Sequence, residues 1–262
     1  MGLFSKWRVH RAFAGGASVE VSERDGIRTL HLGSDTVQSA MRLSAPYDLE
    51  LAYTRSMMGF LLFRPDPARV AMIGLGGGSL AKFVYHRLPG VRTVVVESNP
   101  EVVAAARSHF FLPPEDERFS VVIGEGGQYV AEHPESCDVL MVDGFDGFSQ
   151  AETLSTQTFY EGCARALTGR GVLVVNLWSS DRNFATYLGR IGAAFEGLTL
   201  CLPADKHGNV IVFALKRTAG NPRWDALGDR ARELQARVGL EFPEFVRRLR
   251  EANVHTENRL LI

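Results

Sequence analysis

The 262 residues predict an α/β protein in which a small N-terminal β domain precedes a doubly wound parallel sheet. Three observations favour this fold class. Apolar segments of strand length alternate with amphipathic segments of helix length, the strand segments are apolar on both faces, and the stretch before them alternates apolar with polar residues. Strands that are buried on both faces are typical of a parallel sheet with helices on each side. Apolar residues make up 45% of the chain, which is enough for a substantial core.

The N-terminal region, residues 1–46, is expected to form the small β domain. Residues 18–33 alternate apolar with polar side chains on either side of Asp25-Gly26. Such alternation around an Asp-Gly pair is typical of a β-hairpin. We therefore expect a small sheet ahead of the main fold.

The main α/β domain is expected over residues 47–220. It begins with a helix over residues 47–63, where apolar residues have helical spacing and where Pro65 and Pro67 end the helix. The elements that follow are predicted in this order: strand 68–75, helix 79–88, strand 92–98, helix 100–110, strand 119–124, helix 127–133, strand 137–143, helix 155–167, strand 171–178, helix 182–195, and an antiparallel hairpin of strands 198–203 and 209–216.

A C-terminal helical extension is expected over residues 221–262. The stretch from Trp224 is charged and has helical spacing. Its arginines are expected to form a solvated face: Arg232, Arg237, Arg247, Arg248 and Arg250.

Charge and cysteine content exclude several classes of protein. Lys and Arg total 29 against 30 Asp and Glu, so nothing favours nucleic acid or an anionic membrane as a partner. The three cysteines, Cys137, Cys163 and Cys201, lack metal-ligand spacing and are an odd number, so we expect no metal site and no disulfide framework. The chain has neither an eighteen-residue apolar run nor the apolar core of a signal peptide. We expect a soluble cytoplasmic protein that binds small molecules.

Glycines follow the first strand of the main domain, at Gly74, Gly76 and Gly78, and lead directly into a helix. In an open parallel sheet, ligands bind beyond the carboxyl ends of the strands. Residues without side chains let a ligand approach the backbone and the N-terminus of the helix. This context favours a nucleotide-type ligand over a simple tight turn.

Acidic residues follow the next three strands. Glu97 comes 23 residues after Gly74, close to the spacing expected for a carboxylate that binds ribose hydroxyls. A carboxylate at this place repels a 2'-phosphate and therefore disfavours NADP as the ligand. Glu125 follows the third strand; Asp143 and then Asp146 follow the fourth. Asp-Gly pairs are common in turns, which explains the neighbouring glycines but not a row of acids. Such a row suits a cationic substrate or a sulfonium, and it supplies a proton acceptor.

Several pieces, in order along residues 18–216, resemble the polyamine aminopropyltransferases, the spermidine synthase family. They are Gln38, Glu50-Leu51-Ala52-Tyr53, the glycine loop at 74–78, VVVESNPEVV at 94–103, GEG at 124–126 and VDGFDGFSQAETLSTQTFY at 142–160. The resemblance implies a Rossmann-like, class I methyltransferase-type fold behind a small N-terminal β domain. It also implies transfer of an aminopropyl group from decarboxylated S-adenosylmethionine to an amine, with release of methylthioadenosine.

The resemblance implies a role for each matching residue. Asp143 is the expected general base, whereas Asp146, Glu50 and Tyr53 are expected to bind the amine acceptor. The nucleoside side is expected to be formed by Gln38, Gly74, Gly76, Gly78, Glu97, Glu125 and Gly126, with Glu97 on the ribose and Glu125 near the adenine amino group. We expect no tightly bound cofactor, a small amine acceptor as the partner molecule, and a homodimer.

The chain departs from the family pattern in three places. Gly77 stands where typical members carry an Asp, Thr54 and Arg55 stand where they carry a His and an acid, and the late Tyr-Pro and Trp elements are not evident. Gly77 is expected to leave room for a different amino acid tail. An S-adenosylmethionine-dependent methyltransferase is therefore one alternative. A non-catalytic nucleoside-binding scaffold is the other, although the presence of both Asp143 and Asp146 disfavours it.

Overall fold

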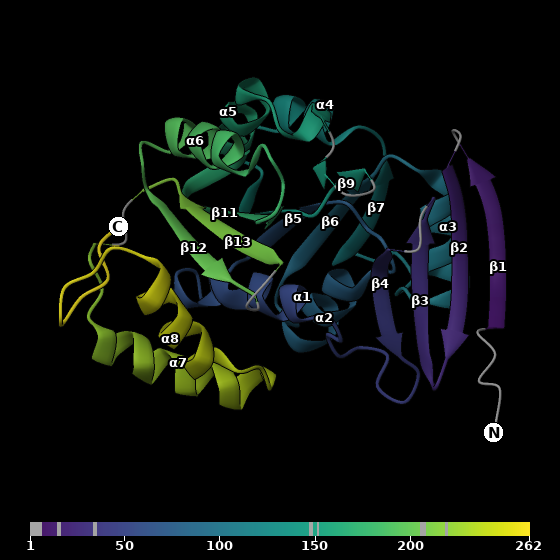
Figure 1. Cartoon of the computed structure of the whole chain (residues 1–262), viewed down its shortest axis with the longest axis horizontal. Helices are drawn as coiled ribbons and strands as arrows, with labels where there is room; N and C mark the ends of the chain where they lie inside the picture. Colours follow the sequence, from purple (N-terminus) through teal and green to yellow (C-terminus); the bar gives the residue numbers. More distant parts are fainter. Residues whose placement is uncertain are drawn as a thin grey trace.

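The computed structural model describes residues 7–14, 17–33, 36–146, 149–150, 152–204, 208–217 and 220–262 (Figure 1). For residues 7–14, 17, 145–146 and 149–150 it describes the backbone alone. The predicted boundaries at 46/47 and 220/221 fall between the N-terminal sheet and the first helix, and between the last strand and the C-terminal helices.

The N-terminal sheet is a four-stranded antiparallel meander of β1 (Trp7–Ala14), β2 (Ala17–Arg24), β3 (Ile27–Leu32) and β4 (Val37–Arg42). The predicted hairpin is confirmed, because β2 pairs with β3 and Arg24 lies opposite Ile27. Asp25 and Gly26 both have positive φ, at 52° and 75°, as the favoured two-residue hairpin turn requires.

The helix predicted over 47–63 is shorter than expected. It consists of α1 (Ala52–Met57), which continues as the 3₁₀-helix η1 (Met58–Leu62). The apolar residue at the start of the predicted helix, Leu49, is buried in the core from an irregular segment. Its apolar character therefore reflects burial rather than a helical turn.

The central sheet confirms the predicted doubly wound arrangement. Its strands are β5 (Arg69–Ile73), β6 (Arg92–Glu97), β7 (Phe119–Ile123), β8 (Cys137–Val142), β11 (Leu167–Trp178), β12 (Thr199–Pro203) and β13 (Asn209–Leu215). They lie in the order β12-β13-β11-β8-β5-β6-β7, and β13 pairs antiparallel with both of its neighbours. The short strands β9 (Phe145–Asp146) and β10 (Ser149–Gln150) form a separate pair.

Helices cover both faces of this sheet (Figure 1). One face packs against α4 (Gly126–Glu132), α5 (Gln157–Ala166) and α6 (Phe184–Ala194), and the 3₁₀-helix η2 (Glu152–Leu154) precedes α5. The other packs against α1, η1, α2 (Ser79–Arg87), α3 (Pro100–His109), α7 (Trp224–Val238) and α8 (Phe242–Ala252).

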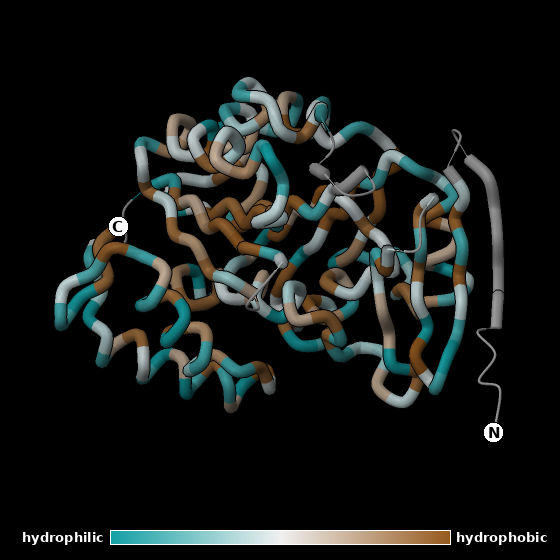
Figure 2. Tube along the Cα trace, in the orientation of Figure 1, coloured by the Kyte–Doolittle hydropathy of each residue, from teal (hydrophilic) through white to brown (hydrophobic). Residues whose placement is uncertain are grey.

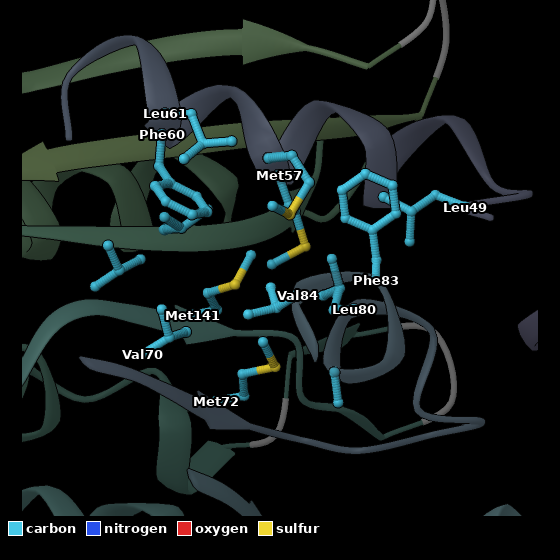
Figure 3. Packing of buried hydrophobic residues seen from close by; sticks show 14 of the residues in the cluster. Leu49, Met57, Phe60, Leu61, Val70, Met72, Leu80, Phe83, Val84 and Met141 are labelled. Atoms are coloured by element: carbon cyan, nitrogen blue, oxygen red, sulfur yellow. The ribbon is translucent and has the colours of Figure 1, made fainter. Parts of the chain in front are cut away.

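Alternate residues of each central strand enter the two cores. Val70 and Met72 of β5 lie in the core on the α2 side, whereas Ala71 and Ile73 lie in the core on the α4 side. Figure 2 shows the apolar residues gathered along these strands and the polar residues on the outer helices. In Figure 3, Met72 points into a layer filled by residues of η1 and α2. Burial on both faces is what the apolar strand segments predicted.

The C-terminal helices correct one prediction. Arg232, Arg247 and Arg250 are exposed, but Arg248 is not part of a solvated face. Its side chain is 15% exposed, and its guanidinium donates hydrogen bonds to the carbonyls of Pro203 and Ala204 at the end of β12. Helix α8 is therefore fastened to the hairpin of β12 and β13. None of the helices in the described ranges has the length and apolar character needed to cross a membrane.

Candidate active site

A cavity of about 800 Å³ lies at the carboxyl ends of the parallel strands, where the strand order reverses between β5 and β8. Many of the predicted site residues line it: Gln38, Tyr53, Gly74, Gly76, Glu97, Glu125, Gly126 and Asp143. Three acids are among the lining residues, and no Lys, Arg or His is found among those in the described part of the chain. The cavity therefore suits a cationic ligand and disfavours a pyrophosphate.

The glycine loop brings two strand ends into contact. Gly74 has a φ of +94°, and a Cβ atom built on it would lie 2.3 Å from the backbone carbonyl oxygen of Asp143. Only glycine fits this position, because another residue would have both a strained φ and a clash with the main chain. The glycine thus sets how closely the loop approaches the base candidate.

Glu97 lies at the end of β6 and accepts backbone hydrogen bonds from both sides of the cavity floor. Its Oε2 accepts from the Leu75 N–H and its Oε1 from the Asn99 N–H, both at 2.9 Å. Burial raises the pKa of this carboxyl, and the backbone N–H donors oppose that shift. Glu97 thus lines the cavity as a carboxylate held in place by main-chain donors.

The N-terminal sheet supplies one wall of the cavity through β4. Gln38 lines the cavity, and its backbone carbonyl accepts a hydrogen bond of 3.3 Å from the Tyr53 hydroxyl. The Ser39 hydroxyl accepts from the Gly77 N–H at 2.9 Å. The two domains are therefore connected through hydrogen bonds at the site itself.

The expectation that Gly77 leaves room for a different amino acid tail is wrong. A Cβ atom at Gly77 would lie 2.9 Å from the Phe110 ring and 3.0 Å from the Ser39 Cβ. The space on this side of the loop is therefore filled by protein. The methyltransferase alternative loses the observation on which it rested.

Asp143 follows β8 and has the chemistry of a proton acceptor. Asn176 of β11 donates to its Oδ1 at 2.8 Å. Burial raises the pKa of the Asp143 carboxyl, and hydrogen bonds from Asn176 and Tyr53 oppose the shift. Burial and the neighbouring Asp143 charge together raise the pKa of Tyr53 well above its ordinary value. Tyr53 therefore stays protonated, and its single hydroxyl proton can point either to the Gln38 carbonyl or to the Asp143 carboxylate.

Several cavity residues were missed by the sequence reasoning, among them Asn176, Trp178 and Asn209. Asn176 is 2% exposed, lies within the apolar strand β11 and is also bonded to Asn209 of β13 at 2.9 Å. A polar residue inside an otherwise apolar strand, as in GVLVVNLW, was a signal in the sequence that could have identified it. Nothing comparable in the sequence marked Asn209.

Two other predicted site residues are placed differently. Gly78 precedes α2 and faces Leu112 rather than the cavity. Glu50 pairs with Arg42 at 2.7 Å and is not among the lining residues. The side chain of Asp146 lies outside the described side chains, so its predicted role stays a prediction.

Comparison with known proteins places the chain in a family. The sequence model of the spermine/spermidine synthase domain matches residues 50–190. The chain is 47% identical over 255 residues to a polyamine aminopropyltransferase of Chromobacterium violaceum, covering 97% of this chain and 98% of the relative. The chain belongs to the spermine/spermidine synthase family.

A second relative and a solved structure agree with this assignment to the family. A polyamine aminopropyltransferase of Neisseria meningitidis serogroup A is 41% identical over 247 residues, which cover 94% of each chain. The crystal structure of a probable spermidine synthase from Corynebacterium glutamicum has a TM-score of 0.74 at 19% identity, covering 97% of this chain and 98% of that one. The family resemblance and the Rossmann-like, class I methyltransferase-type fold are thus confirmed.

Proposed function

We propose that the protein transfers an aminopropyl group from decarboxylated S-adenosylmethionine to an amine acceptor and releases methylthioadenosine. The observation that carries this proposal is the composition of the cavity wall. Three carboxylates line the cavity, and its described lining residues include no Lys, Arg or His. Both reactants are cations, so charge neutralisation favours their binding together in such a cavity. Family membership supports the same reaction.

The adenosyl part of the donor is assigned to the β6 and β7 side. Glu97 accepts bonds from the two ribose hydroxyls, Glu125 lies near the adenine amino group, and Gln38 borders the nucleoside. Glu125 is exposed at the start of α4, as expected for a residue at the rim. Gly74, Gly76 and Gly126 let the donor approach the backbone.

The chemical step is a displacement at carbon. The acceptor nitrogen forms a bond to the carbon next to the sulfonium while the carbon–sulfur bond breaks. The electron pair of that bond goes to sulfur, which becomes the neutral thioether of methylthioadenosine. The proton that the acceptor ammonium must lose goes to Asp143, whose burial makes it a better acceptor than an exposed carboxylate. The remaining contribution is the positioning of the two reactants.

We further propose that Asp146 and Tyr53 orient the cationic acceptor and that Glu50, bonded to Arg42, supports this wall from outside the cavity. We also propose a cytoplasmic homodimer without a tightly bound cofactor. Cys137, Cys163 and Cys201 are free thiols, as a reducing compartment requires. Light scattering of the purified chain tests the dimer directly.

The decisive experiment measures release of methylthioadenosine from decarboxylated S-adenosylmethionine with a panel of amines. Asp143→Asn keeps the shape but removes the proton acceptor, so turnover is expected to fall by about 10² to 10⁴ with little change in methylthioadenosine affinity. Asp25→Asn, at the exposed hairpin turn, is the matched control and is expected to retain full turnover. Methyl transfer from S-adenosylmethionine with no aminopropyl transfer would overturn the proposal.

A further inference from the structure

Two asparagines form a chain of hydrogen bonds that ends at Asp143. Asn176 donates through Nδ2 to Asp143 Oδ1 at 2.8 Å, and Asn209 donates through Nδ2 to Asn176 Oδ1 at 2.9 Å. The three residues come from β8, β11 and β13, which are neighbours in the sheet. They therefore cross the carboxyl end of the sheet in a line.

Strand register explains why these side chains meet. Val175 pairs with Val142, so Asn176 and Asp143 are the next residues along two parallel neighbours. Asn209 lies opposite Trp178 in the antiparallel pair of β11 and β13, two residues from Asn176. Diagonal neighbours of this kind point to the same face and are within reach of each other.

The direction of the hydrogen bonds follows from the chemistry of the amide. An ionised carboxylate only accepts, so Asn176 must turn its NH₂ group toward Asp143. Its carbonyl oxygen then points the other way, into a buried environment where an acceptor without a donor is costly. The NH₂ group of Asn209 supplies that donor and disfavours the flipped orientation of Asn176.

We propose that Asn209 is a positioning residue for the reaction, acting through Asn176 to keep an N–H donor on the carboxylate of Asp143. This inference rests on the proposed function of Asp143 as the base. Its consequence is that Asp143 stays ionised, and ready to accept a proton, at a lower pH than burial alone would allow.

Asn209 is itself fixed by the hairpin and by helix α8. Its backbone carbonyl accepts from the Ala204 N–H at 2.9 Å, and the neighbouring Gly208 carbonyl accepts from the Ser179 N–H at 2.9 Å. Arg248 of α8 donates to the Pro203 and Ala204 carbonyls at the end of the paired strand. The C-terminal extension thus stabilises the strand end from which Asn209 reaches the site.

Among the described side chains, the titratable groups near Asp143 are Tyr53, Glu97 and Glu125. Tyr53 of α1 interacts with Asp143 directly, while Glu97 at the end of β6 and Glu125 before α4 line the same cavity. None of these groups contacts Asn209 among the hydrogen bonds of the described residues. A substitution at Asn209 therefore changes Asp143 through Asn176 rather than through another charge.

The test compares Asn209→Leu, Asn176→Leu and the double variant. Leu has the same branched arrangement of side-chain heavy atoms as Asn and has no donor, so Asn209→Leu is expected to lower turnover about tenfold and to move the acidic limb of the pH profile upward by up to about one unit. Acceptor KM and methylthioadenosine affinity are expected to stay within about twofold. Asn209→Thr, which keeps a donor on a strand-favouring residue, is expected to restore most of the turnover.

The double variant tests whether Asn209 acts through Asn176. If it does, Asn209→Leu has no further effect on the pH profile once Asn176 is Leu. An undiminished effect in that background, or an unmoved profile in both single variants, would overturn the proposal. A ¹³C NMR titration of the aspartate carboxyls, assigned with Asp143→Asn, reads the same pKa without turnover. If the wild-type chain transfers no aminopropyl group but Asn209→Leu still raises the pKa of Asp143 in the NMR titration, the proposed function is refuted and the link from Asn209 through Asn176 to Asp143 is retained.

Discussion

Replacing Gly74 by alanine tests the contact between the glycine loop and Asp143, the proposed base. The φ of +94° costs a residue with a side chain about 1 to 2 kcal/mol. The added Cβ would also lie 2.3 Å from the Asp143 carbonyl oxygen, where an ordinary contact is at least 3.4 Å. Main chain cannot rotate away as a side chain can, so Asp143 or the loop must move by about 1 Å.

Both stability and turnover are expected to respond. Strain of this kind together with overpacking predicts a loss of about 2 to 4 kcal/mol in the free energy of unfolding. A misplacement of about 1 Å in a catalytic group costs about 10² in rate, so turnover is expected to fall by that factor in the fraction that remains folded. Urea unfolding measures the first effect, and methylthioadenosine release at a temperature well below the melting transition measures the second.

Gly127→Ala is the matched control, because it lies in α4 beside the cavity and a Cβ there has nothing within 4 Å. We expect this variant to keep full turnover and to gain up to about 1 kcal/mol in stability from the helix propensity of alanine. If Gly74→Ala keeps wild-type stability and turnover, the close approach of the loop to Asp143 does not exist and the reasoning fails.

Three further substitutions test other residues of the site and the core. Glu97→Ala is expected to weaken methylthioadenosine binding by about 1.5 to 3 kcal/mol in calorimetry, and unchanged affinity would remove Glu97 from the site. In Gly126→Ala the added Cβ would lie 2.4 Å from Ile73 Cγ2, so the free energy of unfolding measured in urea is expected to fall by about 1 to 3 kcal/mol. An unchanged free energy would show that α4 packs loosely at this position. Burial lowers the pKa of Lys82 from 10.5 to about 8, so between these values the unfolded chain binds a proton that the folded chain has lost, and stability rises with pH. Relative to Lys82→Met, the wild type should therefore gain stability between pH 8 and 10.5, and a pH-independent difference would contradict this.

The edge of the sheet at which the site lies was predictable because strand ends can be read from the sequence. Apolar segments without alternation mark parallel strands, and the residues after them necessarily gather at one edge. Glu97 ends a strand, Gly74, Glu125 and Asp143 follow one, and all four line the cavity. No knowledge of strand order was needed for this step.

The contacts between side chains from distant segments were not predictable in the same way. Gly77 suggested empty space, but the absence of a side chain says nothing about which neighbour fills the gap, and Phe110 from the end of α3 fills it. Arg248 suggested a solvated face because the sequence shows its charge but does not show that the Pro203 and Ala204 carbonyls accept its hydrogen bonds. Such contacts depend on helix placement, which apolar periodicity does not determine.

The Asn209–Asn176–Asp143 line shows what register adds to pattern. The sequence marks Asn176 as a polar residue in an apolar strand, but its partner depends on how β13 pairs with β11, and a shift of one residue would turn Asn209 to the other face. The hairpin end that sets this pairing is held by Arg248, far along the chain. The proposed role of Asp143 thus involves a residue, Asn209, whose sequence context gave no sign of it.

Asp143 and Gly144 also answer the question of whether an Asp-Gly pair after a strand is only a turn. A turn aspartate usually bonds to its own backbone two residues on. The carboxylate of Asp143 instead accepts from Asn176 on the neighbouring strand. The backbone N–H of Asp143 donates to the Ile73 carbonyl, and the backbone carbonyl of Asp143 lies against Gly74. Backbone and side chain are both fixed from other strands, and the carboxylate faces a cavity. This arrangement costs desolvation of a charge, which a turn alone would not require and which a base for a cationic amine explains.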